Sequence, residues 1–104
     1  MRRLHIVGRK NSGKTTLMVE LVQCLTQAGL RIGTIKHTHH QHELDTPGKD
    51  SHRHRVAGAQ AIGIVSREMS AVFLPVTTPV DRGDRYATLA PCFVECELVL
   101  VEGD

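Results

Sequence analysis

The chain has 104 residues, enough for one domain with a modest core, and aromatic residues make up only 3% of it, so an aliphatic core is expected. Its formal net charge of +2 is too small to indicate nucleic-acid binding. No apolar run approaches the length of a membrane-spanning helix, so no membrane association is expected.

The N-terminus and the cysteines bear on the cellular compartment. The apolar stretch after Arg2 and Arg3 is short and runs into a glycine-containing segment, which is not the pattern of a signal peptide. Cys24, Cys92 and Cys96 are an odd number without the spacing of a disulfide framework, which favours a reducing cytoplasm. Cys92 and Cys96 are interpreted as ordinary buried thiols rather than a metal pair, because two ligands alone lack partners.

The first predicted elements are a strand over about residues 3–7 and a helix over about residues 16–28. The helix carries Leu17, Leu21, Leu25 and Ala28 on one face, and Gly29 is placed to end it. Between the two elements lies Gly8-Arg9-Lys10-Asn11-Ser12-Gly13-Lys14-Thr15, which matches the phosphate-binding pattern G-x-x-x-x-G-K-[ST]. The order strand, loop, helix is the context that this pattern requires.

The residue types in this loop suit a bound phosphate chain. Gly8 and Gly13 permit backbone angles and close approaches that a Cβ would forbid. The loop N–H groups and the helix N-terminus then form a concave site for anions. Lys14 supplies a positive charge for the β- and γ-phosphates, and the Thr15 hydroxyl is a candidate ligand of Mg²⁺.

The remaining pattern alternates strands and helices. A strand is expected over about residues 31–36, and a short helix capped by Asp50 or Ser51 runs through Ala57, with Gly58 at its end. Residues 61–65 and 71–76 read as strands of a hairpin, followed by a helical turn over residues 86–89. Residues 98–101 form a continuous apolar run, as expected for a central parallel strand. This order predicts an α/β fold with a mostly parallel, doubly wound sheet.

Glu102 follows the last apolar run directly. A carboxylate at the end of a buried strand beside a phosphate loop is where a nucleotide-binding site needs an acid that organises Mg²⁺. The alternative is an ordinary polar residue at the point where a strand leaves the core. The magnesium interpretation is preferred.

A polar segment from His37 to Arg55 contains every histidine except His5, which is interpreted as a structural residue of the first strand. Three interpretations compete. The histidines suit capture of a transition metal. The cations Lys36, Lys49, Arg53 and Arg55 suit an anionic ligand, with Asp45 or Asp50 directed at Mg²⁺ or water. The segment also fits a solvated loop; a switch loop facing an anionic ligand is preferred.

Several segments together resemble one family. They are residues 8–16, Ile35-Lys36-His37-Thr38-His39-His40, Asp45-Thr46-Pro47-Gly48-Lys49-Asp50-Ser51, Ala57-Gly58-Ala59 and Leu98-Val99-Leu100-Val101-Glu102-Gly103. Their combination resembles the MobB family, the adaptor proteins of molybdopterin-guanine dinucleotide biosynthesis. The phosphate loop is shared by many families, whereas the K-H-T-H-H and D-x-P-G-K-D-S segments are much more specific.

The resemblance implies a P-loop fold of three α/β/α layers and a GTP-binding protein that uses Mg²⁺ and hydrolyses GTP weakly. It implies a homodimer in the cytoplasm that assists the molybdopterin guanylyltransferase, the enzyme that attaches GMP to molybdopterin. Carried over by motif, Mg²⁺ would be organised by Thr15 and Glu102. The nucleotide-binding residues would be Gly8, Lys10, Asn11, Ser12, Gly13, Lys14, Thr15, Thr16, Asp45 and Lys49.

Two departures from the family pattern matter. Family members continue well past the V-E-G segment, so residues 1–104 are expected to be a single P-loop domain that forms the N-terminal part of a longer one, with the sheet incomplete at its C-terminal end. In addition, nothing in the chain reads as an N-K-x-D guanine-recognition signal. Guanine specificity therefore rests on the resemblance alone.

Other functions remain as alternatives. A GTP-dependent metallochaperone for nickel or zinc is favoured by the histidine-rich segment. A small-molecule kinase would use the same phosphate loop, but no lid segment with arginines is visible. A binding module without turnover is the third, because no residue declares itself as a catalytic base.

Overall fold

A computed structural model describes residues 1–9, 11–38, 49–76 and 84–103. The chain divides into two compact units. The first unit comprises residues 1–38 and 84–104, and the second comprises residues 39–83. Each unit has its own sheet, and the two are described separately.

The sheet of the first unit is parallel and has the order β1-β5-β2. Its strands are β1 (Arg3–Val7), β2 (Ile32–His37) and β5 (Leu98–Gly103). In β5 the side chains of Val99, Leu100 and Val101 are at most 1% exposed. These observations confirm the prediction that the apolar run forms a central parallel strand. A strand that is covered on both faces has apolar side chains at successive positions.

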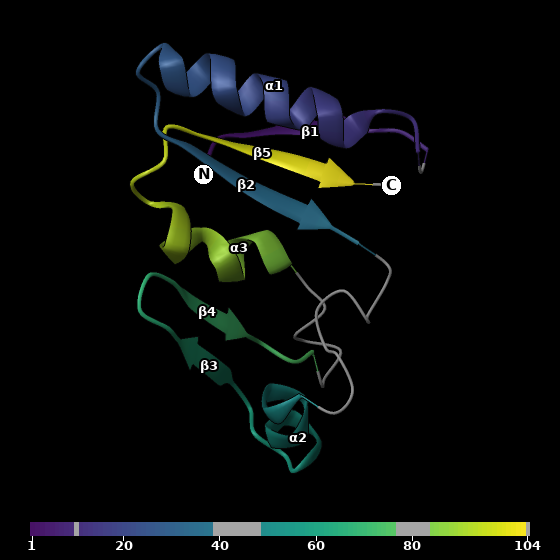
Figure 1. Ribbon diagram of the computed structural model, residues 1–104, viewed down its shortest axis with the longest axis vertical. Coiled ribbons are helices and arrows are strands. Elements are labelled where there is room, and N and C mark those ends of the chain that lie inside the picture. The colour runs from purple at the N-terminus through teal and green to yellow at the C-terminus, as the bar shows by residue number, and fades with distance from the viewer. Residues whose placement is uncertain (10, 39–48, 77–83, 104) are drawn as a thin grey trace. The chain divides into compact units, whose positions relative to one another are not determined.

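Helices cover both faces of this sheet (Figure 1). Helix α1 (Lys14–Gln27) contacts all three strands on one face, where Thr15 meets Glu102. Helix α3 (Arg85–Leu89) and the 3₁₀ helix η3 (Ala90–Phe93) lie on the other face. There Tyr86 contacts His5, and Phe93 packs over Gly33. The three-layer α/β/α fold expected from the sequence is confirmed.

Helix α1 begins two residues earlier than predicted, because Gly13 is its N-cap. At the other end Gly29 adopts φ 90°, as the predicted stop requires. The predicted buried face is wrong in part: Leu17 is 46% exposed, whereas Met18 is buried. The sheet is instead faced by a stripe that starts at Met18 and continues through the partly buried Leu21, Val22 and Leu25. This stripe has the i, i+3, i+4, i+7 spacing of a single helix face.

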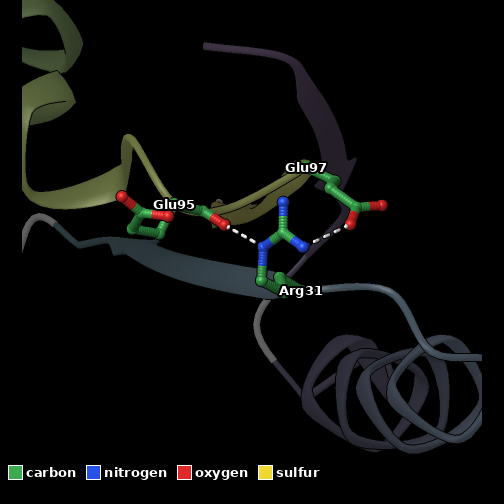
Figure 2. A network of polar contacts seen from close by, with 3 residues as sticks. All are labelled: Arg31, Glu95 and Glu97. Carbon is green, nitrogen blue, oxygen red and sulfur yellow. Dashed lines mark hydrogen bonds and ion pairs between the residues drawn. The ribbon is translucent and has the colours of Figure 1, made fainter.

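The turn into β5 is tied to the start of β2 by Arg31 (Figure 2). Its Nε donates a 2.6 Å hydrogen bond to the carbonyl of Glu95, and its guanidinium lies 3.1 Å from the Glu97 carboxylate. The backbone N–H of Glu97 also donates to the Arg31 carbonyl at 2.8 Å. These contacts hold the amino ends of the two neighbouring strands together.

The second unit contains helix α2 (Asp50–Val56) and an antiparallel hairpin of β3 (Ile62–Val65) and β4 (Ser70–Phe73). The hairpin confirms the prediction, and its turn is closed by a 2.8 Å bond from the Ser66 N–H to the Met69 carbonyl. Ile62 is the buried residue of β3, on the strand that contacts α2.

The predicted cap of the short helix α2 is wrong. Lys49 is the N-cap, with no side-chain hydrogen bond, and both Asp50 and Ser51 already lie inside the helix. Asp50 in the first turn still faces the positive end of the helix dipole, which accounts for its placement there. Gly58, with φ 111°, ends this element as predicted.

The interpretation of Cys92 and Cys96 as ordinary buried thiols is wrong for Cys92 and correct only in part for Cys96. Cys24 and Cys92 are exposed, and Cys96 is partly buried beside Phe93 and Gly33. Cys92 lies in η3, a short 3₁₀ helix whose residues are at best partly buried. Among the described residues, no helix is both long enough and apolar enough to cross a membrane.

Candidate functional site

The loop between β1 and α1 has the backbone that its glycines predict. Gly13 adopts φ 88° and Asn11 φ 62°, both in the left-handed region. The N–H of Ser12 turns back to the carbonyl of Arg9 at 3.2 Å. A Cβ at Gly8 would lie 3.0 Å from the Ser12 hydroxyl oxygen, so a glycine is needed for the loop to close.

The N-terminus of α1 opens onto this loop. Its N-cap, Gly13, has no side chain that can accept from the N–H groups of the first turn. Those N–H groups and the positive end of the helix dipole are the elements of an anion site. Thr15 and Thr16 lie in the first turn, so their backbone N–H groups are among those at this helix end.

Lys14 holds a positive charge against the loop. Its ammonium donates to the carbonyl of Gly8 at 2.7 Å and to the carbonyl of Arg9 at 3.2 Å. The side chain thus folds back along the loop instead of extending into solvent, and it is partly buried. The two contacts with the loop carbonyls therefore restrain the position of the ammonium.

Thr15 and Glu102 meet although they are 87 residues apart in the chain. The Thr15 hydroxyl donates to Oε1 of Glu102 at 2.5 Å. The proton is engaged by the carboxylate, so the hydroxyl oxygen keeps its lone pairs for another partner. Hydroxyl and carboxylate oxygens are ligands that hard cations prefer, and this pair therefore suits Mg²⁺.

The site lies at the carboxyl edge of the parallel sheet. In register, Val7 and His37 pair with Gly103, so all three strands end at one edge. Ligands of open α/β sheets bind at this edge. Tyr86, which the sequence reasoning did not single out, also lies here: its hydroxyl is 3.0 Å from Nδ1 of His37. Tyr86 is the only tyrosine in a chain with few aromatic residues, and this is the feature of the sequence that could have pointed to it.

The other predicted site residues divide into three groups. Asn11 and Ser12 are in the loop and exposed. Lys10 and Asp45 lie outside the described residues, as does most of the histidine-rich segment. Lys49 belongs to the second unit. Within the described ranges, no group of three or more His, Cys, Asp or Glu side chains is arranged to hold a metal ion.

Comparison with known proteins assigns the family. Residues 3–103 match the profile of the family described as MobB, molybdopterin guanine dinucleotide synthesis protein B. This chain belongs to the MobB family. The resemblance drawn from the sequence segments is thereby confirmed, and it extends over nearly the whole chain.

Two curated relatives of this MobB-family chain carry the name molybdopterin-guanine dinucleotide biosynthesis adapter protein. The one from Escherichia coli is 36% identical over 88% of this chain and 53% of its own length. The one from Haemophilus influenzae is 36% identical over 96% of this chain and 55% of its own length. The chain thus spans about half the length of the curated relatives that it matches.

A solved MobB structure has the same fold. The MobB homologue from Bacillus stearothermophilus is 32% identical and superimposes with a TM-score of 0.62. The match covers 99% of this chain and 56% of that one. The mostly parallel sheet with flanking helices is therefore the MobB fold, as far as this chain extends.

Proposed function

We propose that this protein is a GTP-binding adaptor in the biosynthesis of molybdopterin guanine dinucleotide, with at most weak GTP hydrolysis. The observation that carries the proposal is the joined pair of a phosphate-loop hydroxyl and a strand-end carboxylate, Thr15 and Glu102, at 2.5 Å. The names of the relatives supply the pathway.

The phosphate-binding residues in this proposal are those of the loop and the first helical turn. Gly8, Gly13 and Lys14 supply the backbone shape and the positive charge, as described above. Thr15 would bind Mg²⁺ through its hydroxyl oxygen, and Glu102 would orient that hydroxyl and a water ligand of the ion. The remaining contributors in the proposal are Lys10, Asn11, Ser12, Thr16, Asp45 and Lys49.

The proposed partner is the molybdopterin guanylyltransferase, which attaches GMP to molybdopterin. The name adapter protein, which the relatives carry, supports action through a partner enzyme. A cytoplasmic homodimer is part of the same proposal. Neither nucleic acid nor membrane is proposed as a partner.

Calorimetric titration with Mg²⁺–GTP, and separately with Mg²⁺–ATP, tests the nucleotide proposal. We expect GTP to bind more tightly than ATP, and Lys14→Ala to weaken GTP binding by at least about a hundredfold, because a charge-assisted contact to the phosphates is lost. Arg67→Ala is the matched control. This substitution also removes one positive charge, but Arg67 lies in the exposed β3–β4 turn. The affinity of Arg67→Ala for GTP should therefore match that of the wild type.

The outcomes separate the parts of the proposal. Retained GTP affinity in Lys14→Ala would contradict the assignment of the phosphate loop. Equal binding of ATP and GTP would contradict guanine preference and leave phosphate binding intact. Absence of binding of either nucleotide to the wild type would overturn the proposed function.

The partner is tested by guanylyltransferase assays with and without this protein. We expect addition of the wild-type protein to raise the rate of dinucleotide formation at limiting GTP, and addition of Lys14→Ala not to do so. An equal stimulation by both proteins would show that any effect on the enzyme does not pass through the nucleotide site.

A further inference from the structure

Tyr86 connects the two outer strands of the sheet in the first unit. Its ring lies under the guanidinium of Arg3, with Cζ 4.5 Å from the ring centroid, and makes an edge contact with His5 at 5.7 Å. Its hydroxyl is 3.0 Å from Nδ1 of His37 on the opposite outer strand. One side chain of α3 thus reaches both β1 and β2.

The helix that carries Tyr86 is held in place by its own cap. Oδ1 of Asp84 accepts from the N–H of Ala87 at 3.1 Å, so the first turn of α3 is closed around Tyr86. A capped start fixes the direction in which the tyrosine side chain leaves the helix. Its hydroxyl is therefore presented to His37 from a defined position.

His37 in turn lies beside the end of the central strand. It pairs with Gly103 in the parallel register, and a Cβ on Gly103 would be 3.6 Å from the Cβ of His37. Gly103 directly follows Glu102, the carboxylate that receives the Thr15 hydroxyl. Contacts thus run from Tyr86 through His37 and Gly103 to Glu102.

We infer that Tyr86 is a positioning residue of the nucleotide site: its hydroxyl holds His37 against the end of β5 and so fixes Glu102 for Thr15 and the bound cation. The inference rests on the proposed function of the loop. Among the described residues, the polar and ring contacts of Tyr86 are with Arg3, His5 and His37, and none of these belongs to the loop. Its effect passes through the strand ends.

The last residue of an outer strand is more weakly held than the residues before it. His37 ends β2, an outer strand of the described sheet, and its side chain is exposed. A strand end held only by its ladder bonds frays more easily than one whose side chain is also bonded. The hydroxyl bond restrains this end, and a cation site needs its ligands placed within a narrow range.

The first experiment compares the wild type with Tyr86→Phe, which keeps the ring contacts with Arg3 and His5 and removes only the hydroxyl. Hydrolysis or binding of GTP is measured as a function of Mg²⁺ concentration. We expect the half-saturating Mg²⁺ concentration to rise between about twofold and tenfold, the range that loss of one neutral hydrogen bond produces. Affinity for GTP in excess EDTA should not change.

Glu97→Gln is the matched control. It weakens a contact of β2 with β5 at the opposite, amino end of the same two strands, where Glu97 faces Arg31. If Tyr86 acted only through the general stability of the sheet, both variants would raise the half-saturating Mg²⁺ concentration (the Mg²⁺ midpoint) by the same factor. We expect Glu97→Gln to leave it at the wild-type value.

Substitutions at His37 test the pathway itself. In His37→Ala the partner of the hydroxyl is gone, and the midpoint should rise as in Tyr86→Phe. In His37→Asn a side-chain amide takes the place of Nδ1 as the partner of the hydroxyl, so the half-saturating Mg²⁺ concentration should return toward the wild-type value. The double variant Tyr86→Phe/His37→Ala should be no worse than His37→Ala alone, because the hydroxyl bond is already absent in that single variant.

Nitrogen NMR of the His37 imidazole provides a readout independent of nucleotide. A bond between the Tyr86 hydroxyl and Nδ1 favours one tautomer of the neutral ring, protonated on Nε2 where the hydroxyl donates and on Nδ1 where it accepts. In either case Tyr86→Phe should release this preference. An unchanged tautomer, or an unchanged Mg²⁺ midpoint in Tyr86→Phe, would overturn the inference alone. Absence of GTP binding to the wild type would instead overturn the proposed function and, with it, this role of Tyr86.

Discussion

The hydroxyl of Thr15 donates a 2.5 Å hydrogen bond to Oε1 of Glu102, joining the first turn of α1 to the end of β5. The two residues are brought together by the parallel sheet. β5 lies between β1 and β2, so its carboxyl end is next to the loop that follows β1. A hydroxyl and a carboxylate are oxygen groups of the kind that hard cations prefer as ligands.

Glu102→Gln tests the charge of this pair. The amide still accepts from Thr15, but it no longer attracts a divalent cation. We expect affinity for Mg²⁺–GTP to fall about tenfold, which corresponds to about 1.4 kcal/mol. Affinity for GTP without Mg²⁺ should stay or rise, since a negative charge near the phosphates is removed. Calorimetry with Mg²⁺ and with EDTA measures both, and an equal loss in the two conditions would contradict the magnesium role.

Gly13→Ala tests the backbone of the loop. Gly13 adopts φ 88°, and an added Cβ would have no atom within 4 Å, so the cost is backbone strain and not a clash. We expect the free energy of unfolding to fall by about 1–2 kcal/mol. Nucleotide affinity should fall as well, because the first-turn N–H groups shift.

The control for this variant is Gly58→Ala. Gly58 ends α2 with φ 111° and likewise has no atom within 4 Å of an added Cβ. A similar loss of stability is expected, measured by urea denaturation, but with unchanged nucleotide affinity. If both variants lost affinity equally, the effect of Gly13→Ala would be one of general stability.

The elements that the sequence predicted well are those with strong local signals. The uninterrupted apolar run of residues 98–101 is typical of a strand covered on both faces, and it is the centre of the sheet. Gly29 and Gly58 were correctly placed at the ends of their helices. Each adopts a positive φ angle there, which glycine does far more readily than other residues. On the predicted face of α1, Leu21 and Leu25 were placed correctly, but Met18 takes the position expected for Leu17. Several overlapping apolar stripes exist on this helix, and only its packing on the sheet selects one.

The candidate site was predictable to a similar extent. The loop pattern located Lys14 and Thr15, and the end of the apolar run located Glu102, whose contact with Thr15 the structure shows. Tyr86 and its contact with His37 were not predicted. Their separation of 49 residues carries no sequence pattern, and the contact depends on how α3 lies on the sheet. The role of Lys49 stays a prediction.

Leu100→Ala tests the core of the first unit. Leu100 is 0% exposed at the middle of β5, so truncation leaves a cavity between α1 and the sheet. We expect a loss of about 2–5 kcal/mol in the free energy of unfolding, measured by urea denaturation. Leu74→Ala is the control, because Leu74 is 44% exposed and should cost much less. Equal costs would contradict the central position of β5.

Gly33→Ala tests the packing of η3 on the sheet. A Cβ at Gly33 would lie 2.5 and 2.9 Å from two ring carbons of Phe93 and 3.0 Å from Sγ of Cys96. Relief requires the Phe93 ring to turn or η3 to move away from β2, so we expect a loss of about 1–3 kcal/mol in the free energy of unfolding. Gly63→Ala in β3 is the control, because nothing lies within 4 Å of its added Cβ. Phe93→Leu in the Gly33→Ala background should recover part of the loss by vacating the ring's space. Urea denaturation of the wild type and the three variants measures these differences, and a Gly33→Ala variant as stable as the wild type would contradict the packing of Phe93 on this strand.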